Sequence, residues 1–133
     1  MSARQSVIPS RTPWPVISVG RDRALLMARQ TALEERGIGV HSVCPEQAEF
    51  PAHDGKPRIW VMCGSIEEAT LVFLACTIRR YSAGSPLFLV EWTRPAGAER
   101  CLFHRVLGHD VGDDALAAAI RNGWKGATRS LGD

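Results

Sequence analysis

The sequence predicts an α/β fold in which a parallel, five-stranded sheet carries helices on both faces. Three observations lead to this prediction. The chain has 133 residues, the size of one domain with one hydrophobic core. Five short apolar runs have the length of strands, and segments of helical composition lie between most of them. Connections between parallel strands are right-handed, so this alternation places helices on both faces of the sheet.

The first strand and helix follow an expected N-terminal tail. Residues 1–14 are predicted to be flexible, and the folded domain is predicted to span residues 15–124. Val16 to Val19 is an apolar run of strand length. The segment from about Asp22 to Arg36 is rich in Ala, Leu, Met and Arg and is predicted to be helical. Asp22 is its expected N-cap, and Gly37 lies directly after its end.

A short strand, a short helix and a longer strand come next. Val40 to Val43 is predicted to be the second strand. Residues 45–50 are expected to form one or two helical turns that end at Pro51, because proline cannot continue the backbone hydrogen bonds of a helix. Arg58 to Cys63 is mostly apolar, which is typical of a strand covered on both faces.

The second half of the chain completes the pattern. Ser65 to Glu68 matches the S-x-x-E capping box and predicts a helix from there to about Tyr81. Two further apolar strands are expected at residues 87–90 and 101–106. An Ala-rich helix is predicted from Asp113 to Asn122, where Gly123 stops it, and residues 125–133 are expected to form a flexible C-terminal tail.

Composition and charge exclude several classes of function. The net charge of +2 comes without a clustered basic face, which argues against nucleic-acid binding. No apolar run approaches the roughly 18 residues that a membrane span needs, so no membrane association is expected. Cysteines occur at widely spaced positions without a CxxC pair or zinc-site spacing, at Cys44, Cys63, Cys76 and Cys101. We therefore expect a soluble cytoplasmic protein with reduced thiols and no cofactor or metal.

Local phrases between Pro15 and Trp124 occur in the same order and spacing as in a known family. These phrases are Val16-Ile-Ser-Val-Gly-Arg-Asp22, Leu33-Glu-Glu-Arg-Gly37, Pro57-Arg-Ile-Trp-Val-Met-Cys63, Ser85-Pro-Leu-Phe-Leu-Val90 and Gly97-Ala-Glu-Arg-Cys-Leu-Phe-His104. Taken together, they resemble the receiver domain of two-component response regulators. The resemblance implies a flavodoxin-like, doubly wound sheet and a role in signal transduction.

The same resemblance implies a degenerate phosphorylation site. Family members place an acidic pair after the first strand, a phosphorylated aspartate after the third, a Ser or Thr after the fourth and a Lys after the fifth. The matching positions here are Gly20-Arg21 (with Asp22 one place late), Cys63, Glu91 and His104. A thiol cannot form an acyl phosphate, and Arg21 places a cation where Mg²⁺ would bind. We expect a vestigial site at Gly20, Arg21, Asp22, Cys63, Glu91 and His104, with no catalytic residue and no enzyme activity.

Cys63, Glu91 and His104 could also carry redox or acid–base chemistry, or they could have a structural role. Cys63 precedes a helix start, where a thiolate is favoured, but a C-x₅-R loop would need an arginine in place of Ala69 and a CxxC motif a cysteine in place of Ile66. Glu91 and His104 could form an acid–base pair. The structural interpretation is that Arg21 or a charged His104 compensates a buried Glu91.

The predicted function is a phosphorylation-independent pseudo-receiver that acts through protein–protein contacts. Pro51 shortens the second helix, and only Trp92 to Arg100, with Pro95 and Gly97, is left for a fourth helix before the last strand. A homodimer is possible, because sheet surface left uncovered needs a partner. Trp92 and Arg94 are the candidate interaction residues. The alternative is a small-ligand or thiol-redox sensor that uses a crevice at Cys63, Glu91 and His104.

Overall fold

The computed structural model describes residues 15–92, 102–108 and 112–132, with only the backbone described at residues 91–92 and 124–132. Its elements, in chain order, are β1 (Val16–Val19), α1 (Arg23–Glu35), β2 (Val40–Val43), α2 (Pro45–His53), β3 (Ile59–Cys63), α3 (Glu68–Tyr81), β4 (Leu87–Trp92), β5 (Arg105–Gly108) and α4 (Asp113–Gly132). The predicted shortening of the family's fourth helix, at residues 93–100, and the predicted N-terminal tail lie outside the described residues.

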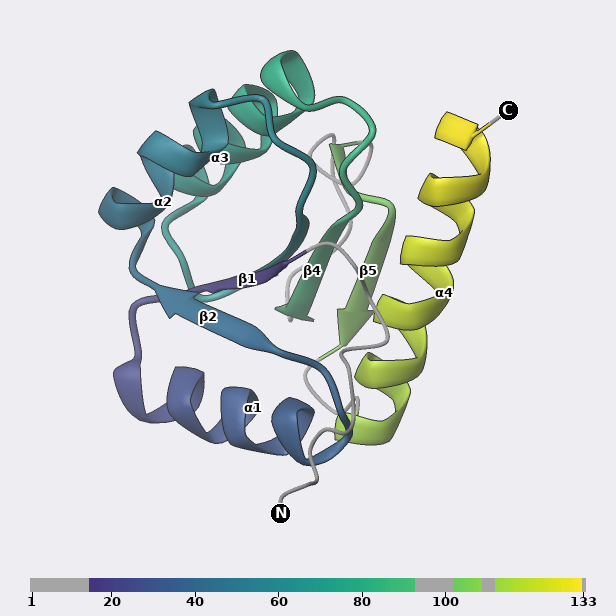
Figure 1. Ribbon diagram of the computed structural model, residues 1–133. Helices are drawn as coiled ribbons and strands as arrows, with labels where there is room; N and C mark the ends of the chain where they lie inside the picture. Colours follow the sequence, from purple (N-terminus) through teal and green to yellow (C-terminus); the bar gives the residue numbers. More distant parts are fainter. Residues whose placement is uncertain (1–14, 93–101, 109–111, 133) are drawn as a thin grey trace.

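The sheet has the predicted architecture. Five parallel strands lie in the order β2-β1-β3-β4-β5. Helices α1 and α4 cover one face, while α2 and α3 lie side by side on the other (Figure 1). The doubly wound α/β fold is therefore confirmed.

Alternate residues of the central strands feed two cores. Ile17, Trp60 and Met62 pack beneath α2 and α3. Val16 and Val61 pack beneath α1 and α4. This alternation follows from the two-residue period of a strand, and burying both faces explains why β3 is almost wholly apolar.

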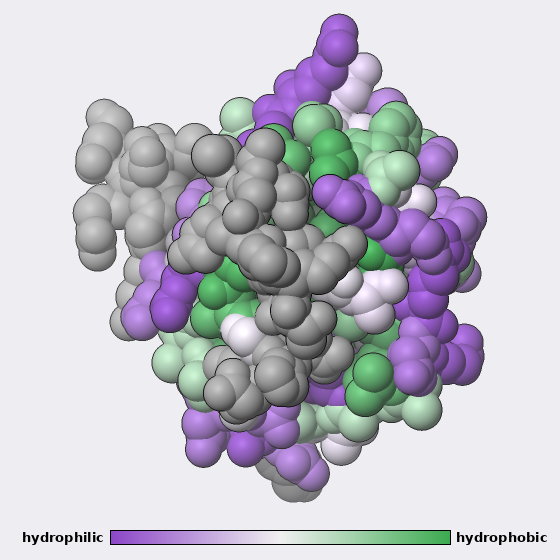
Figure 2. All heavy atoms as spheres, turned by 180° about the vertical axis from the view of Figure 1, so that it is seen from behind, coloured by the Kyte–Doolittle hydropathy of each residue, from purple (hydrophilic) through white to green (hydrophobic). Residues whose placement is uncertain are grey.

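Seen from behind, apolar atoms reach the surface near the middle of the molecule, while hydrophilic side chains occupy much of the edge (Figure 2).

The ends of α1 agree with the sequence. The Asp22 carboxylate accepts a hydrogen bond from the Leu25 amide at 3.2 Å, as an N-cap does. Gly37 follows the helix with φ of +84°, a conformation that glycine adopts without strain. Both signals depend on a few adjacent residues.

The predicted end of α2 is wrong, because the helix continues through Pro51 to His53. The Pro51 carbonyl accepts hydrogen bonds from the Arg58 guanidinium at 3.0 Å and from the Asp54 amide at 3.4 Å. These hydrogen bonds satisfy the Pro51 carbonyl in the last turn of the helix. At nine residues, α2 is still shorter than α1 and α3.

The capping box predicted at Ser65 does not form. Helix α3 begins at Glu68, and Glu67 occupies the N-cap position without a side-chain cap bond. Ser65 lies in the preceding turn, and its hydroxyl is 3.1 Å from the Cys63 sulfur. Ser65 thus contacts the end of β3 and does not cap α3.

The last two elements also differ from the prediction. β5 begins at Arg105 instead of Cys101, because Arg105 pairs with Phe88 and Val106 with Leu89. The apolar character of Leu102 and Phe103 has another cause: both pack into the α2–α3 core from the turn before the strand.

Helix α4 does not stop at Gly123 but continues to Gly132. A Cβ atom at Gly123 would lie 2.5 Å from Phe88 Cζ, so this glycine allows the helix to approach the sheet. The mobility expected for residues 125–133 stays a prediction.

Candidate functional site

The carboxyl ends of the central strands bring Gly20, Cys44 and Cys63 to one edge of the sheet. The Gly20 amide donates to the Val43 carbonyl at 3.2 Å, and the Gly64 amide donates to the Val90 carbonyl at 2.7 Å. Strand order reverses between β1 and β3, and in open α/β sheets such a point is where ligands bind. The edge at Gly20 and Cys63 is thus where a site is expected.

Cys63 and Gly20 are packed together at this point. Cys63 is the last residue of β3 and is 4% exposed. A Cβ atom at Gly20 would lie 3.4 Å from the Cys63 Cβ and 3.2 Å from Leu26 Cδ2. A side chain at residue 20 would therefore lie close to Leu26 and Cys63, and the end of the Leu26 side chain would have to shift slightly.

Arg21 bridges helix α2 and the loop that precedes α3. Its guanidinium makes a bidentate pair with Glu67, with Nε–Oε2 at 2.6 Å and Nη2–Oε1 at 2.7 Å. It also donates to Glu46 Oε1 at 3.1 Å. Arg21 thus connects the start of α2 to the loop between β3 and α3.

The charges of this cluster stabilise one another. Glu67, and then Glu46, raise the pKa of Arg21 above its usual value, and Arg21 lowers the pKa of each glutamate. All three side chains are largely exposed, so water and salt screen their attraction. The ion pairs of Arg21 with Glu46 and Glu67 therefore fix the relative position of α2 and the loop before α3 more than they add to the free energy of unfolding.

The residues at this edge do not fit the Mg²⁺ ion that the family resemblance implies. Magnesium takes hard oxygen ligands. Gly20 offers no side chain, Arg21 is a cation held by carboxylates, and the Asp22 carboxylate caps α1. Among the described residues, no group of three or more His, Cys, Asp or Glu side chains could hold a metal ion.

The predicted place of His104 is wrong. His104 precedes β5 and lies at the amino edge of the sheet, where its Nδ1 accepts a hydrogen bond at 3.0 Å from the amide of Leu87, the first residue of β4. Cys63 pairs with Val90 at the opposite end of that strand. The structure therefore does not bring His104 together with Cys63, and the predicted crevice that includes both does not form.

The surroundings of His104 also disfavour the positive charge that was expected on it. Arg79 Nη2 lies 3.3 Å from His104 Nδ1, and Arg79 donates to the Leu102 carbonyl at 2.9 Å. Burial, and then the positive charge of Arg79, lower the pKa of His104. The neutral ring, with its proton on Nε2, is the form that this arrangement favours.

Three other predicted residues are described only in part or not at all. Glu91 and Trp92 end β4, which is two residues longer than expected, and their side chains lie outside the description. Arg94 falls in residues 93–101, which are not described.

Within the described residues, no helix combines the length and apolar character of a membrane span.

Sequence reasoning missed Glu46 and Glu67, the two partners of Arg21. The capping-box prediction gives a role to Ser65 and Glu68 and none to Glu67, and Glu46 is predicted only to lie in a short helix. A usable signal was present, because these residues follow the second and third strands, and the carboxyl ends of parallel strands meet at one edge.

The comparisons with known proteins place the fold among receiver domains. No model of a protein family matches the sequence, and no curated protein matches it significantly. Among solved structures, a CheY-like response regulator receiver domain from Methanospirillum hungatei JF-1 superposes with a TM-score of 0.73 at 14% identity, covering 88% of this chain and 98% of that one.

Two further structures are similar to the same degree. A protein described as an adenylate cyclase from Rhodopirellula baltica has a TM-score of 0.72 at 15% identity, with 89% of this chain and 92% of that one covered. The complex of the histidine kinase ThkA with the response regulator TrrA contains a chain with a TM-score of 0.71 at 12% identity, with 83% and 97% covered. At these identities the similarity shows that the chain has the receiver fold.

Proposed function

We propose that this protein is a pseudo-receiver: a signalling module that binds other proteins and does not take up phosphate. The proposal includes the absence of enzyme activity. Its chief support is the edge at Cys63, where Gly20 has no side chain to bind a metal ion and Arg21 is held by Glu46 and Glu67.

Phosphoryl transfer in receivers depends on positioning and on compensation of charge. The thiol of Cys63 replaces an acid that could carry the phosphoryl group, and it is 4% exposed. The sheet nevertheless keeps the receiver architecture. A retained fold without the chemistry favours a function that depends on surface contacts.

The neighbouring structures support a role in signalling. One of them is a response regulator in complex with a histidine kinase. We extend protein binding, but not phosphorylation, to the present chain.

A phosphodonor assay tests the proposal. The protein is incubated with acetyl phosphate and Mg²⁺, and its intact mass is compared with that of an active receiver treated in parallel. We expect no phosphoryl adduct on this chain. We also expect none on the Cys63→Asp variant, because Gly20 and Arg21 still provide no metal ligand. An adduct on the wild-type protein would contradict the proposal.

The sensor alternative receives less support. Its three-residue crevice is not formed, since His104 lies at the other edge of the sheet. The thiol-redox form of this alternative is left with Cys63, whose buried sulfur reagents must reach. The small-ligand form is left with a different pocket of about 440 Å³, which Gly20, Arg21 and Cys44 line and Cys63 does not.

A further inference from the structure

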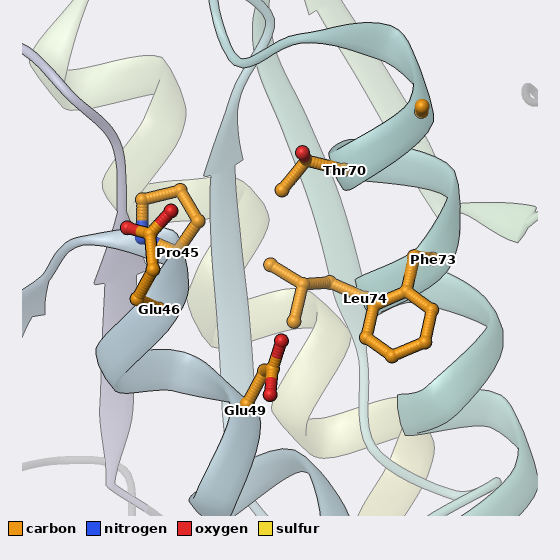
Figure 3. A pocket seen from close by; sticks show the side chains of 7 residues that line it. Pro45, Glu46, Glu49, Thr70, Phe73 and Leu74 are labelled. Carbon is orange, nitrogen blue, oxygen red and sulfur yellow. The ribbon is translucent and has the colours of Figure 1, made fainter.

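A groove separates α2 from α3 on the side of the molecule away from α1 and α4. It has a volume of about 230 Å³. Its lining includes Pro45, Glu46 and Glu49 from α2, and Thr70, Phe73 and Leu74 from α3 (Figure 3). We call this feature the α2–α3 groove.

The α2–α3 groove joins an apolar floor to exposed aromatic surface. Leu74 is fully buried and projects between the two helices, while the Phe73 ring stands beside it and is 51% exposed (Figure 3). On α2, Phe50 is 79% exposed. Phe50 does not line the groove, so Phe73 is the exposed apolar side chain that a bound partner would cover there.

All charged side chains in the described lining are acidic. Glu46 is already paired with Arg21. Glu49 lies at the groove, and no described residue pairs with it. A carboxylate beside apolar surface favours a partner that brings a cation together with an apolar anchor.

The volume of the groove distinguishes between two kinds of occupant. Pockets for small molecules usually enclose about 300–1,000 Å³ and bury most of the ligand. At about 230 Å³, the α2–α3 groove is better suited to one side chain of a larger partner. Amphipathic helices dock in this way, with one apolar face in a groove between helices.

We propose that the α2–α3 groove docks a basic amphipathic helix of a partner protein. An apolar side chain of that helix packs on Leu74 and Phe73, and a lysine or arginine one turn away pairs with Glu49. This inference rests on the proposed interaction function and names the surface and the class of partner.

A synthetic amphipathic helix of leucine and lysine serves as the probe, with a matched helix of leucine and glutamate as its opposite. Binding is followed by chemical-shift changes in the ¹⁵N-labelled full chain. We expect the basic helix to shift amides that border the groove. We expect Glu49→Lys to weaken its binding about fivefold or more and to improve binding of the acidic helix. Phe73→Ser should weaken binding about tenfold.

Glu35→Lys is the matched control, because Glu35 ends α1 on the opposite layer and carries the same charge change. It should alter binding less than twofold, and circular dichroism should show each variant folded. Equal losses for Glu35→Lys and Glu49→Lys would overturn the proposal, since they indicate unspecific attraction. A self-association that Phe73→Ser abolishes would also overturn it, because the occupant is then a second copy. If the groove fails this test while the phosphodonor assay gives no adduct, the docking site alone is refuted.

Discussion

At the scale of single residues, Cys63 and Cys76 differ chiefly in their access to solvent. Neither is in a disulfide, but Cys63 is buried beside Gly20, while Cys76 is exposed on α3. Cys44 is intermediate. Because alkylation requires the reagent to reach the sulfur, burial should govern the order of reaction.

Among the three cysteines that the structure describes, we predict that iodoacetamide modifies Cys76 first and Cys63 last in the native protein at neutral pH. Peptide mass spectrometry after brief labelling measures both rates in one sample, so Cys76 is an internal control. In denaturant the two rates should converge. A Cys63 that reacts as fast as Cys76 in the native state would support the sensor alternative instead.

His104 gives a second prediction at this scale. Burial and Arg79 lower its pKa in the folded protein from the usual value near 6.5. The unfolded chain therefore binds a proton more readily than the folded chain as the pH falls below about 6.5. This contribution to stability is complete above that pH and is lost as the pH falls through the lowered value.

Urea unfolding of the wild-type protein and the His104→Asn variant at several pH values tests this assignment. Asparagine can keep an acceptor for the Leu87 amide but does not titrate. We expect the wild-type protein to lose stability between neutral pH and about pH 5 and the variant to lose less. Equal losses would show that His104 does not carry the effect.

At the scale of elements, α4 packs closely on β4 because residue 123 is glycine. A Cβ atom there would meet the Phe88 ring at 2.5 Å, well inside contact distance. Phe88 is itself 1% exposed and has little room to move. Glycine lowers intrinsic helix stability by about 1 kcal/mol, so its presence within α4 needs a packing reason, and Phe88 provides one.

We predict that Gly123→Ala lowers the free energy of unfolding by about 1–2 kcal/mol, because overpacking outweighs the gain in helix propensity. Gly39→Ala is the control: nothing lies within 4 Å of its added Cβ, and stability should change by less than about 1 kcal/mol. Adding Phe88→Leu to Gly123→Ala should recover part of the loss. A Gly123→Ala variant as stable as the wild-type protein would contradict the packing argument.

Elements were predictable from sequence to different degrees. The Asp22 cap and the turn at Gly37 involve neighbouring residues, and both formed as expected. The start of β5 was not predicted correctly. The apolar residues Leu102 and Phe103 give the same sequence pattern whether they lie in a strand or pack into a core from a turn. That error of four residues moved His104 from one edge of the sheet to the other.

At the scale of the whole molecule, ion pairs fix the relative positions of segments. Hydrophobic packing alone would not fix these positions. Arg58 and Asp54 form a bidentate pair, with N–O distances of 2.6 and 2.7 Å, between the end of α2 and the start of β3. Both side chains are less than one-fifth exposed. Arg58, followed by the Lys56 amide, lowers the pKa of Asp54 to about 2 against burial, which acts in the opposite direction.

We predict that Asp54→Asn lowers the free energy of unfolding by about 1–3 kcal/mol at neutral pH. Since the pKa of Asp54 is depressed on folding, its contribution is present above about pH 4 and is lost as the pH falls towards 2. Chemical unfolding at a series of pH values should therefore show the two proteins converging in acid.

Asp114→Asn is the matched control for this measurement. Asp114 pairs with Arg36 at 2.7 Å between α4 and α1, but its side chain is 92% exposed. Solvent screens such a pair, so the change in stability should stay below about 0.5 kcal/mol. Equal effects of the two substitutions would mean that burial does not decide the strength of these pairs.

The sequence by itself determined the order of the strands and their alternation with helices, because both depend on short apolar runs and on local helix signals. Only the tertiary structure decided that Arg21 pairs with Glu46 and Glu67, that Gly123 lies against Phe88 and that His104 is at the amino edge. These arrangements depend on strand register and on contacts between residues far apart in the chain. A local pattern carries no information about either, since the same residue types are compatible with several partners until the sheet brings one of them within reach.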